Sequence, residues 1–210
     1  MEQTKQTRQM VKRIFDFIVS LVVILIALPI WLVVALAIKI DSPGPIFYRG
    51  VRVGKKGKVF SIFKFRTMVL EAPNCGPGIT KDADPRVTRV GRILRKFKID
   101  EMPQLINVLK GEMSIMGPRP EDPKYVAFYP KEYEQILQVR PGMASPAFIK
   151  YRHEEELLAA TRGNVEEVYL KKILPDKLRL DMEYVKNQSF IGDLTIFARA
   201  ALSLFKRNKR

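Results

Sequence analysis

The chain has 210 residues, of which 47% are hydrophobic, and its formal net charge is +15. This length suits one domain with a sizeable core, and the charge implies an anionic partner: nucleic acid, an acidic membrane surface or a phosphorylated substrate. The lone cysteine, Cys75, excludes an intramolecular disulfide, and together with the lone His153 it leaves no Cys/His zinc site.

Residues 17–38 carry no charged side chain, and a helix of this length spans roughly 33 Å at about 1.5 Å per residue. The run is longer than a signal-peptide core, so it predicts a retained membrane segment. Basic residues flank both ends: Lys5, Arg8, Lys12 and Arg13 before, and Lys39, Arg49 and Arg52 after. Both ends are therefore predicted on the cytoplasmic side. A helix that kinks at Pro29 and returns to the same face satisfies both flanks, while an ordinary span stays open.

After Pro45 the pattern changes to that of β-strands. Aromatic and β-branched residues fill the ranges 46–48, 51–53 and 59–68, with the turn-forming Gly54-Lys55-Lys56-Gly57 between the last two. These features predict a small β-hairpin. Alternation along the last run places Phe63 and Phe65 on one face and Lys64 and Arg66 on the other. The basic pair is either a solvated face or points into a site.

Residues 71–86 have the composition of a loop. Its Asp82-Ala83-Asp84 could hold a metal, but the following proline favours a turn cap. Between residues 87 and 97 apolar residues recur at helical spacing, with Arg89, Arg92, Arg95 and Lys96 between them. This pattern predicts a basic amphipathic helix near anionic lipid.

The adjacent carboxylates Asp100 and Glu101 precede a predicted helix that begins near Pro103 and is stopped by Gly111. A helix N-terminus favours the charged carboxylate, so Asp100 is predicted to be ionised at neutral pH and available as a nucleophile or metal ligand. Ordinary helix capping would also explain this aspartate. Glu101 adds a second carboxylate, as a site for Mg²⁺ would need.

Cations surround this pair in the sequence. Arg95, Lys96 and Lys98 lie just upstream, and Gly117-Pro118-Arg119-Pro120 lies downstream. Two prolines of fixed φ limit the movement of Arg119, a side chain suited to bidentate binding of phosphate. The alternative is a rigid turn with a surface arginine.

Three further helices are predicted near residues 154–158, 165–174 and 176–187, the last two separated by Pro175. Apolar residues at helical spacing from Phe190 onward, followed by a basic tail, predict a C-terminal interfacial helix at about 190–206. A core helix with a basic tail is the competing interpretation.

Taken together, these segments resemble a known family. The matching motifs are Lys12-Arg13, Phe15-Asp16, Gly44-Pro45, Arg52-Val53-Gly54, Lys64-Phe65-Arg66-Thr67-Met68, Asp84-Pro85-Arg86, Asp100-Glu101 with Pro103-Gln104-Leu105, Asn107 to Gly111, Gly117 to Pro120, and Arg140-Pro141-Gly142. The chain is similar to bacterial sugar transferases of the small monotopic phosphoglycosyl transferase family. It departs from the commoner pattern at residues 143–153 and at Leu28, where many relatives have serine.

The resemblance implies an enzyme that transfers a sugar-1-phosphate from a UDP-sugar to undecaprenyl (polyprenyl) phosphate and releases UMP. Asp100 would attack the β-phosphorus, Glu101 would help to hold Mg²⁺ or manage protons, and Asp100 and Glu101 would be the metal ligands. The phosphates would be bound by Arg95 and Arg119, and by Lys64 and Arg66.

The resemblance also implies an α+β, mainly helical fold with a re-entrant membrane helix broken at Pro29, a small β-hairpin and interfacial amphipathic helices. Residues 1–40 are predicted as the membrane-inserted helix and residues 41–210 as a catalytic domain on the cytoplasmic face of the bacterial inner membrane. The expected partners are a UDP-sugar, polyprenyl phosphate and anionic phospholipid, without nucleic acid; a homo-oligomer stays open. The rival hypothesis is a non-catalytic basic module that binds anionic lipid or nucleic acid.

Overall fold

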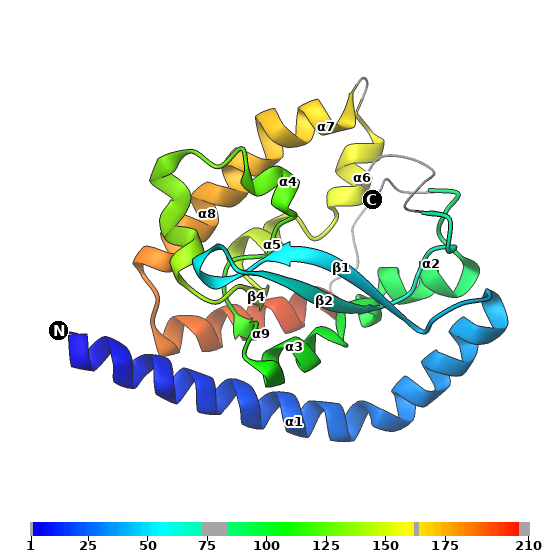
Figure 1. Ribbon diagram of the computed structural model, residues 1–210, viewed down its shortest axis with the longest axis horizontal. Helices are drawn as coiled ribbons and strands as arrows, with labels where there is room; N and C mark the ends of the chain where they lie inside the picture. Colours follow the sequence, from blue (N-terminus) through cyan, green and yellow to red (C-terminus); the bar gives the residue numbers. More distant parts are fainter. Residues whose placement is uncertain (1, 73–83, 162–163, 206–210) are drawn as a thin grey trace.

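The computed structural model describes residues 2–72, 84–161 and 164–205, which fold mainly into helices around a small hairpin (Figure 1). The α-helices are α1 Glu2–Asp41, α2 Arg89–Lys96, α3 Gln104–Lys110, α4 Pro123–Val126, α5 Pro146–Lys150, α6 Glu154–Ala159, α7 Val165–Val168, α8 Leu174–Lys186 and α9 Phe190–Phe205. Short 3₁₀ segments are η1 Lys55–Gly57, η3 Ile99–Glu101 and η4 Lys131–Gln138, and a π-helical turn, η5, covers Tyr169–Ile173. The predicted α+β, mainly helical class is confirmed.

The first helix, α1, is continuous and contains Pro29 in its interior. A proline there cannot donate to the carbonyl of Leu25, and its ring crowds that carbonyl, which bends a helix. Figure 1 shows α1 changing direction along its length. The predicted break at Pro29 is thus a bend within an unbroken helix. Residues Thr7–Asp41 are long and apolar enough to cross a membrane, and the re-entrant course stays a prediction.

Two faces of α1 have different surroundings. One face packs into the protein, where Trp31 and Ile38 are buried against Phe65 of the hairpin and Leu94 of α2. The opposite face exposes large apolar side chains: Leu25, Ile26, Leu32, Val33, Leu36 and Ile40. Hence α1 is part of the hydrophobic core and also carries an uncovered apolar surface.

The hairpin forms as predicted. Strands β1 (Phe47–Val53) and β2 (Val59–Phe65) pair antiparallel, with Phe47 opposite Phe65 at the open end. Their connection passes through η1, in which Lys56 and Gly57 have positive φ angles of 58° and 72°. The alternation is also as predicted: Phe65 is buried and stacks on Phe47 with ring centroids 5.5 Å apart.

A second, parallel pair of strands was not predicted. It joins β3 (Ser114–Met116) to β4 (Gly142–Ala144), two segments too short to give a periodic pattern. A Cβ atom on Gly142 would collide with the backbone of Gly117, so the close approach needs glycine here. This pairing fixes the start of the Gly117–Pro120 loop.

The two helices predicted around Pro175 are one continuous helical path. Helix α7 passes through the π turn η5 into α8, and Pro175 lies in the first turn of α8. The wider π turn accommodates a residue that has no N–H for regular helical bonding. This turn carries Tyr169, which is buried.

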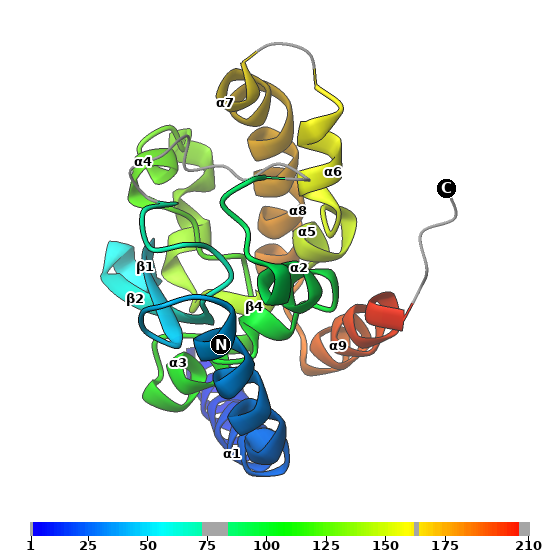
Figure 2. The same ribbon diagram turned by 90° about the vertical axis from the view of Figure 1, so that its right-hand side faces the viewer.

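Figures 1 and 2 place α1 at one end of the molecule and α4, α6 and α7 at the opposite end, with the hairpin between them. A core cluster at the far end contains Ile136, Leu158, Ile173, Leu178 and Met182. At the other end, Arg13 of α1 donates to the carbonyls of Val108 and Leu109, the latter at 2.8 Å, and so anchors α1 to the last turn of α3.

Candidate active site

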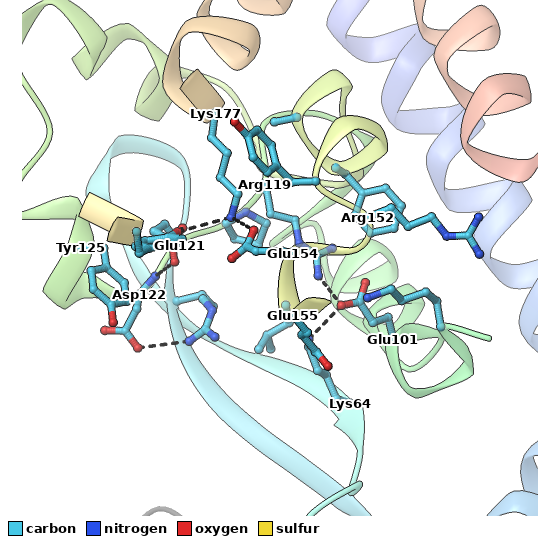
Figure 3. A pocket seen from close by; sticks show the side chains of 18 of the residues that line it. Lys64, Glu101, Arg119, Glu121, Asp122, Tyr125, Arg152, Glu154, Glu155 and Lys177 are labelled. Atoms are coloured by element: carbon cyan, nitrogen blue, oxygen red, sulfur yellow. Dashed lines mark hydrogen bonds and ion pairs between the residues drawn. The ribbon is translucent and has the colours of Figure 1, made fainter. Parts of the chain in front are cut away.

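A cavity of about 400 Å³ opens between the hairpin, η3, the loop before α4, and helices α5, α6 and α8 (Figure 3). Its lining combines basic, acidic and aromatic side chains from these elements: Arg52, Lys64, Lys98, Glu101, Arg119, Glu121, Asp122, Lys124, Tyr125, Phe148, Tyr151, Arg152, Glu154, Glu155, Tyr169 and Lys177. Three of the residues predicted from the sequence are among them. They are Lys64, Glu101 and Arg119.

Asp100 and Glu101 lie in η3, immediately before α3, as predicted. Lys98 enters η3 with a positive φ of 57°, Pro103 caps α3, and Gly111 ends it with a φ of 82°. Both carboxylates are buried, with exposed fractions of 8% and 9%. The short 3₁₀ segment therefore places Glu101 in the wall of the cavity, while Asp100, the residue before it, is buried and is not among the lining residues.

The pKa of Asp100 moves in the opposite direction to that expected at a helix N-terminus. Burial raises its pKa to about 6, because loss of water, together with the charge of Glu101, penalises the charged form more than the nearby cation Lys64 favours it. The Oδ1 atom of Asp100 has no hydrogen-bond partner among the described residues. At neutral pH this carboxylate is still mainly ionised, and it is poorly solvated.

Glu101 has the opposite balance. Burial alone would raise its pKa, but the charges of Arg119, Lys64 and Lys98 outweigh burial and hold the pKa well below its usual range. Its Oε1 accepts hydrogen bonds from Lys64, at 2.9 Å, and from Arg119. Two neighbouring carboxylates thus have pKa values displaced in opposite directions, a pattern found in many active sites.

Arg119 is held on several sides. Its backbone N–H donates to Asp181 at 3.1 Å, its Nη1 donates to the carbonyl of Met143 at 3.0 Å, and its guanidinium lies 5.1 Å from the ring centroid of Phe148. Arg119 therefore lies against Glu101, and both its backbone and its side chain are hydrogen-bonded within the protein.

Arg66 and Arg95 do not line the cavity. The guanidinium of Arg66 donates to the carbonyls of Pro43 and Ser42, the latter at 2.8 Å, so it joins β2 to the end of α1 and does not point into the site. Arg95 pairs at 2.6 Å with Glu155, which does line the cavity. It acts on Asp100 only through its charge.

The Asp82-Ala83-Asp84 motif is described only at Asp84, because Asp82 lies outside the described residues. Asp84 accepts hydrogen bonds from the backbone and guanidinium of Arg86, the shortest at 2.7 Å. This arrangement matches the predicted turn cap.

Sequence reasoning missed one part of the cavity. Glu121, Glu154, Tyr169 and Lys177 meet at its other side, although they come from the loop before α4, from α6, from η5 and from α8. Glu121 follows the Gly117–Pro120 motif directly, which was a usable signal. The other three have no distinctive local pattern.

Within the described residues, no group of three or more His, Cys, Asp or Glu is gathered as in a protein metal site. Asp100 and Glu101 offer two carboxylates, and the Oδ1 of Asp100 is buried with no hydrogen-bond partner among the described residues. Mg²⁺ is commonly held by one or two carboxylates, with water and substrate phosphates completing its shell. The donor set therefore fits Mg²⁺ only in the presence of a phosphorylated substrate.

The sequence of the chain is similar to that of known proteins. The family described as bacterial sugar transferase matches residues 7–207. The chain is 39% identical over 197 residues to the UDP-glucose:undecaprenyl-phosphate glucose-1-phosphate transferase of Caulobacter vibrioides, covering 92% of this chain and 69% of that protein.

Two further relatives differ in length. The chain is 37% identical to the UDP-N-acetylgalactosamine-undecaprenyl-phosphate N-acetylgalactosaminephosphotransferase of Aeromonas hydrophila, covering 89% of this chain but 41% of that protein. It is 36% identical to the exopolysaccharide production protein PSS of Rhizobium leguminosarum, covering 94% and 96%.

Proposed function

The chain belongs to the bacterial sugar transferase family, and on that basis we propose that it transfers a sugar-1-phosphate from a UDP-sugar to polyprenyl phosphate, releasing UMP. The names of its relatives support this reaction class, since they pair undecaprenyl phosphate with glucose or N-acetylgalactosamine phosphate. These sugars differ, so the names do not select one for this chain.

The observation that carries the proposal is the buried Asp100–Glu101 pair, in which Glu101 lines a cavity rich in cations and Asp100 lies directly beside it in the chain. Asp100 is a poorly solvated carboxylate with an unpartnered oxygen, which favours a nucleophile. Lys64 and Arg119 both donate hydrogen bonds to Glu101, the residue that follows Asp100 in the chain. They would bind the phosphates that Asp100 must approach.

In the first step an oxygen of Asp100 attacks the β-phosphorus of the UDP-sugar. A bond forms between the carboxylate oxygen and the β-phosphorus, and the bond from that phosphorus to the bridging oxygen breaks. UMP leaves with the bridging oxygen, and the sugar phosphate stays attached to Asp100. Arg119 would stabilise charge on the equatorial and leaving oxygens.

In the second step a phosphate oxygen of the polyprenyl acceptor attacks the same phosphorus. The bond to Asp100 breaks, the carboxylate is regenerated, and the product is a polyprenyl diphosphate-linked sugar. Dividing the transfer into two displacements allows the donor and the acceptor to use one set of phosphate-binding residues in turn.

Glu101 would contribute to the site through its fixed charge. It stays ionised because its pKa is well below the ordinary value, and it orients Lys64 and Arg119. Mg²⁺, held by Asp100, Glu101 and the donor phosphates, would neutralise charge on the diphosphate so that a carboxylate can approach.

The non-catalytic binding module is not favoured. A basic protein that binds lipid or nucleic acid has no need for two buried carboxylates beside a cavity, and the family is one of transferases. The proposed location is the inner membrane with the cavity on the cytoplasmic side, since α1 supplies an apolar surface and UDP-sugars are cytoplasmic.

The experiment is a measurement of UMP released from a panel of UDP-sugars by detergent-solubilised protein with Mg²⁺, with and without undecaprenyl phosphate. We expect turnover with at least one sugar, a single burst of UMP without acceptor, and an adduct of one sugar phosphate on Asp100 by mass spectrometry. Asp100→Ala and EDTA should abolish release, whereas Glu167→Gln, which changes an exposed ion pair outside the lining of the cavity, should not. A burst that is absent in active protein would refute the covalent route.

A further inference from the structure

The cavity has two polar clusters on opposite sides. Figure 3 shows Glu101 between Lys64 and Arg119 on one side, and the Lys177 side chain reaching between Glu121 and Glu154 on the other. We call the first the phosphate cluster and the second, with Tyr169, the acidic cluster. The proposed chemistry uses only the phosphate cluster.

The acidic cluster is tightly connected. Lys177 forms an ion pair with Glu154 and lies 3.4 Å from the Tyr169 hydroxyl, which in turn donates to Glu121. Burial, together with the charge of Glu121, raises the pKa of Tyr169, so its hydroxyl keeps its proton and remains a donor. Lys177 and Glu154 retain exposed side-chain fractions of 16% and 23%, which leaves them accessible from the cavity.

The two clusters carry charge of opposite sign. In the acidic cluster, Glu121 and Glu154 face the single ammonium of Lys177. Other charges near it are already matched: Arg52 pairs with Asp122 at 3.3 Å, and Lys124 pairs with Glu166. In the phosphate cluster, Lys64 and Arg119 both bind Glu101. The acidic cluster therefore disfavours an anion, while phosphate is attracted to the opposite side.

An ionised carboxylate can only accept hydrogen bonds, and the ammonium of Lys177 can only donate them. A pair of neighbouring hydroxyl groups satisfies both, because each hydroxyl donates and accepts. The rings of Phe148 and Tyr151 line the same cavity and offer apolar faces to a ring. This combination suits an uncharged, hydroxyl-bearing ring.

We propose that Glu121, Glu154 and Lys177 bind vicinal hydroxyl groups in the uncharged part of the donor that lies away from the reacting phosphate. The proposal rests on the function proposed above, and it adds donor-binding residues outside the phosphate cluster. Two parts of a nucleotide sugar have this chemistry, the sugar ring and the ribose.

The test compares Glu154→Gln with Glu167→Gln, which removes the same charge from an exposed Lys–Glu pair outside the cavity. Purified full-length variants are assayed for the KM of the UDP-sugar, for the single-turnover rate at saturating donor, and for UMP binding by calorimetry. We expect Glu154→Gln to raise the KM about tenfold, as for loss of a hydrogen bond to a charged group. The saturated rate should change by less than about twofold, because the cluster lies away from the reacting atoms.

The affinity for UMP, which contains the ribose but not the sugar, distinguishes the two possible sources of the hydroxyl groups. If UMP binding weakens as much as donor binding, the acidic cluster holds the ribose; if UMP binding is unchanged, it holds the sugar. The double variant Glu154→Gln/Lys177→Gln keeps a neutral hydrogen-bonding pair and covers the case in which the single variant is unstable. A KM and a UMP affinity equal to those of Glu167→Gln in both variants would overturn the inference. Failure of the wild type to release UMP from any UDP-sugar would instead overturn the proposed function.

Discussion

Burial of Asp100 has opposite consequences for folding and for reactivity. Its pKa in the folded protein, about 6, lies above that of an exposed aspartate, so folding favours the protonated carboxyl. The resulting destabilisation is absent below the unfolded pKa near 4 and reaches its full extent once the pH exceeds about 6. The ionised carboxylate that the proposed chemistry needs is therefore an unfavourable feature of the native state at neutral pH.

Asp100→Asn should separate these two effects. An amide of similar shape removes the buried charge, so we expect a gain in unfolding free energy of roughly 1–3 kcal/mol at pH 7.5 and complete loss of UMP release. Thermal unfolding of the variant and wild type at pH 7.5 and at pH 4.5 measures the gain, which should be clearly smaller at the lower pH. Equal stabilities at pH 7.5 would contradict the raised pKa.

The pH dependence of the first chemical step should follow the same group. Single-turnover UMP release is expected to fall below about pH 6 as Asp100 becomes protonated, approaching a tenfold loss per pH unit. Glu101 should cause no second change in the rate between pH 5 and 8, because its pKa is well below the ordinary range. A rate that is constant down to pH 5 would argue against Asp100 as the nucleophile.

Lys64 and Arg66 form a matched test, since they lie two residues apart, Lys64 in β2 and Arg66 directly after it. Lys64→Gln should reduce the single-turnover rate by about 10²-fold or more, because a cation of the phosphate cluster is lost, with a small effect on stability. Arg66→Gln should lower the unfolding free energy by roughly 1–3 kcal/mol, because the carbonyls of Ser42 and Pro43 lose their donor. Steady-state rates and thermal melts of both variants give the comparison, and the reverse pattern would refute this assignment.

At the scale of single residues, the sequence was informative where chemistry and spacing coincide. Asp100, Glu101 and Arg119 were predicted because adjacent carboxylates, a helix start and a proline-bounded arginine lie within one segment. The alternation in β2 gave the face of Arg66 but could not give its partners, because the carbonyls it binds belong to a turn far along the chain. The raised pKa of Asp100 depends on burial by distant segments, which local sequence does not encode.

Among the elements, the hairpin and α3 were predicted from strand alternation, a glycine-rich turn and Gly111, all of which are local signals. The β3–β4 pair was missed because three residues per strand give no period. Pro175 was interpreted as a separator, but the π turn η5 before it keeps the helical path continuous. This turn sets the direction of Tyr169, so the acidic cluster could not be assembled from sequence.

The course of α1 through a membrane is testable with cysteines at its two ends. Met10 and Ile40 are exposed, by 61% and 78%, and each can be replaced by cysteine in a Cys75→Ser background. If α1 is re-entrant, a membrane-impermeant maleimide should label both positions in inverted vesicles and neither in right-side-out spheroplasts. Labelling of the two ends from opposite sides would establish a span, and Pro29→Ala should move the protein toward that result.

For the whole molecule, the net charge of +15 and the apolar face of α1 predict two separable contributions to membrane binding. Association with vesicles that contain anionic lipid should be stronger than with zwitterionic vesicles, and the difference should shrink as salt rises from about 0.05 to 0.5 M. The part of binding that survives high salt reports on apolar insertion. Sedimentation with vesicles measures the salt-sensitive and the salt-resistant parts of binding. Binding that does not change with salt would contradict a contribution of charge.

Helix α1 is buried on one face and has exposed apolar side chains on the other. This arrangement also affects how the enzyme would reach its lipid acceptor. Because the same helix contributes to the core beneath the hairpin, the distance from a lipid surface to Asp100 is set by packing and not by a flexible tether. In a bilayer the acceptor phosphate is confined to one plane, so its search for the nucleophile becomes two-dimensional. If Asp100 is held at the level of the acceptor phosphate, the enzyme does not need to lift a long-chain lipid out of the membrane.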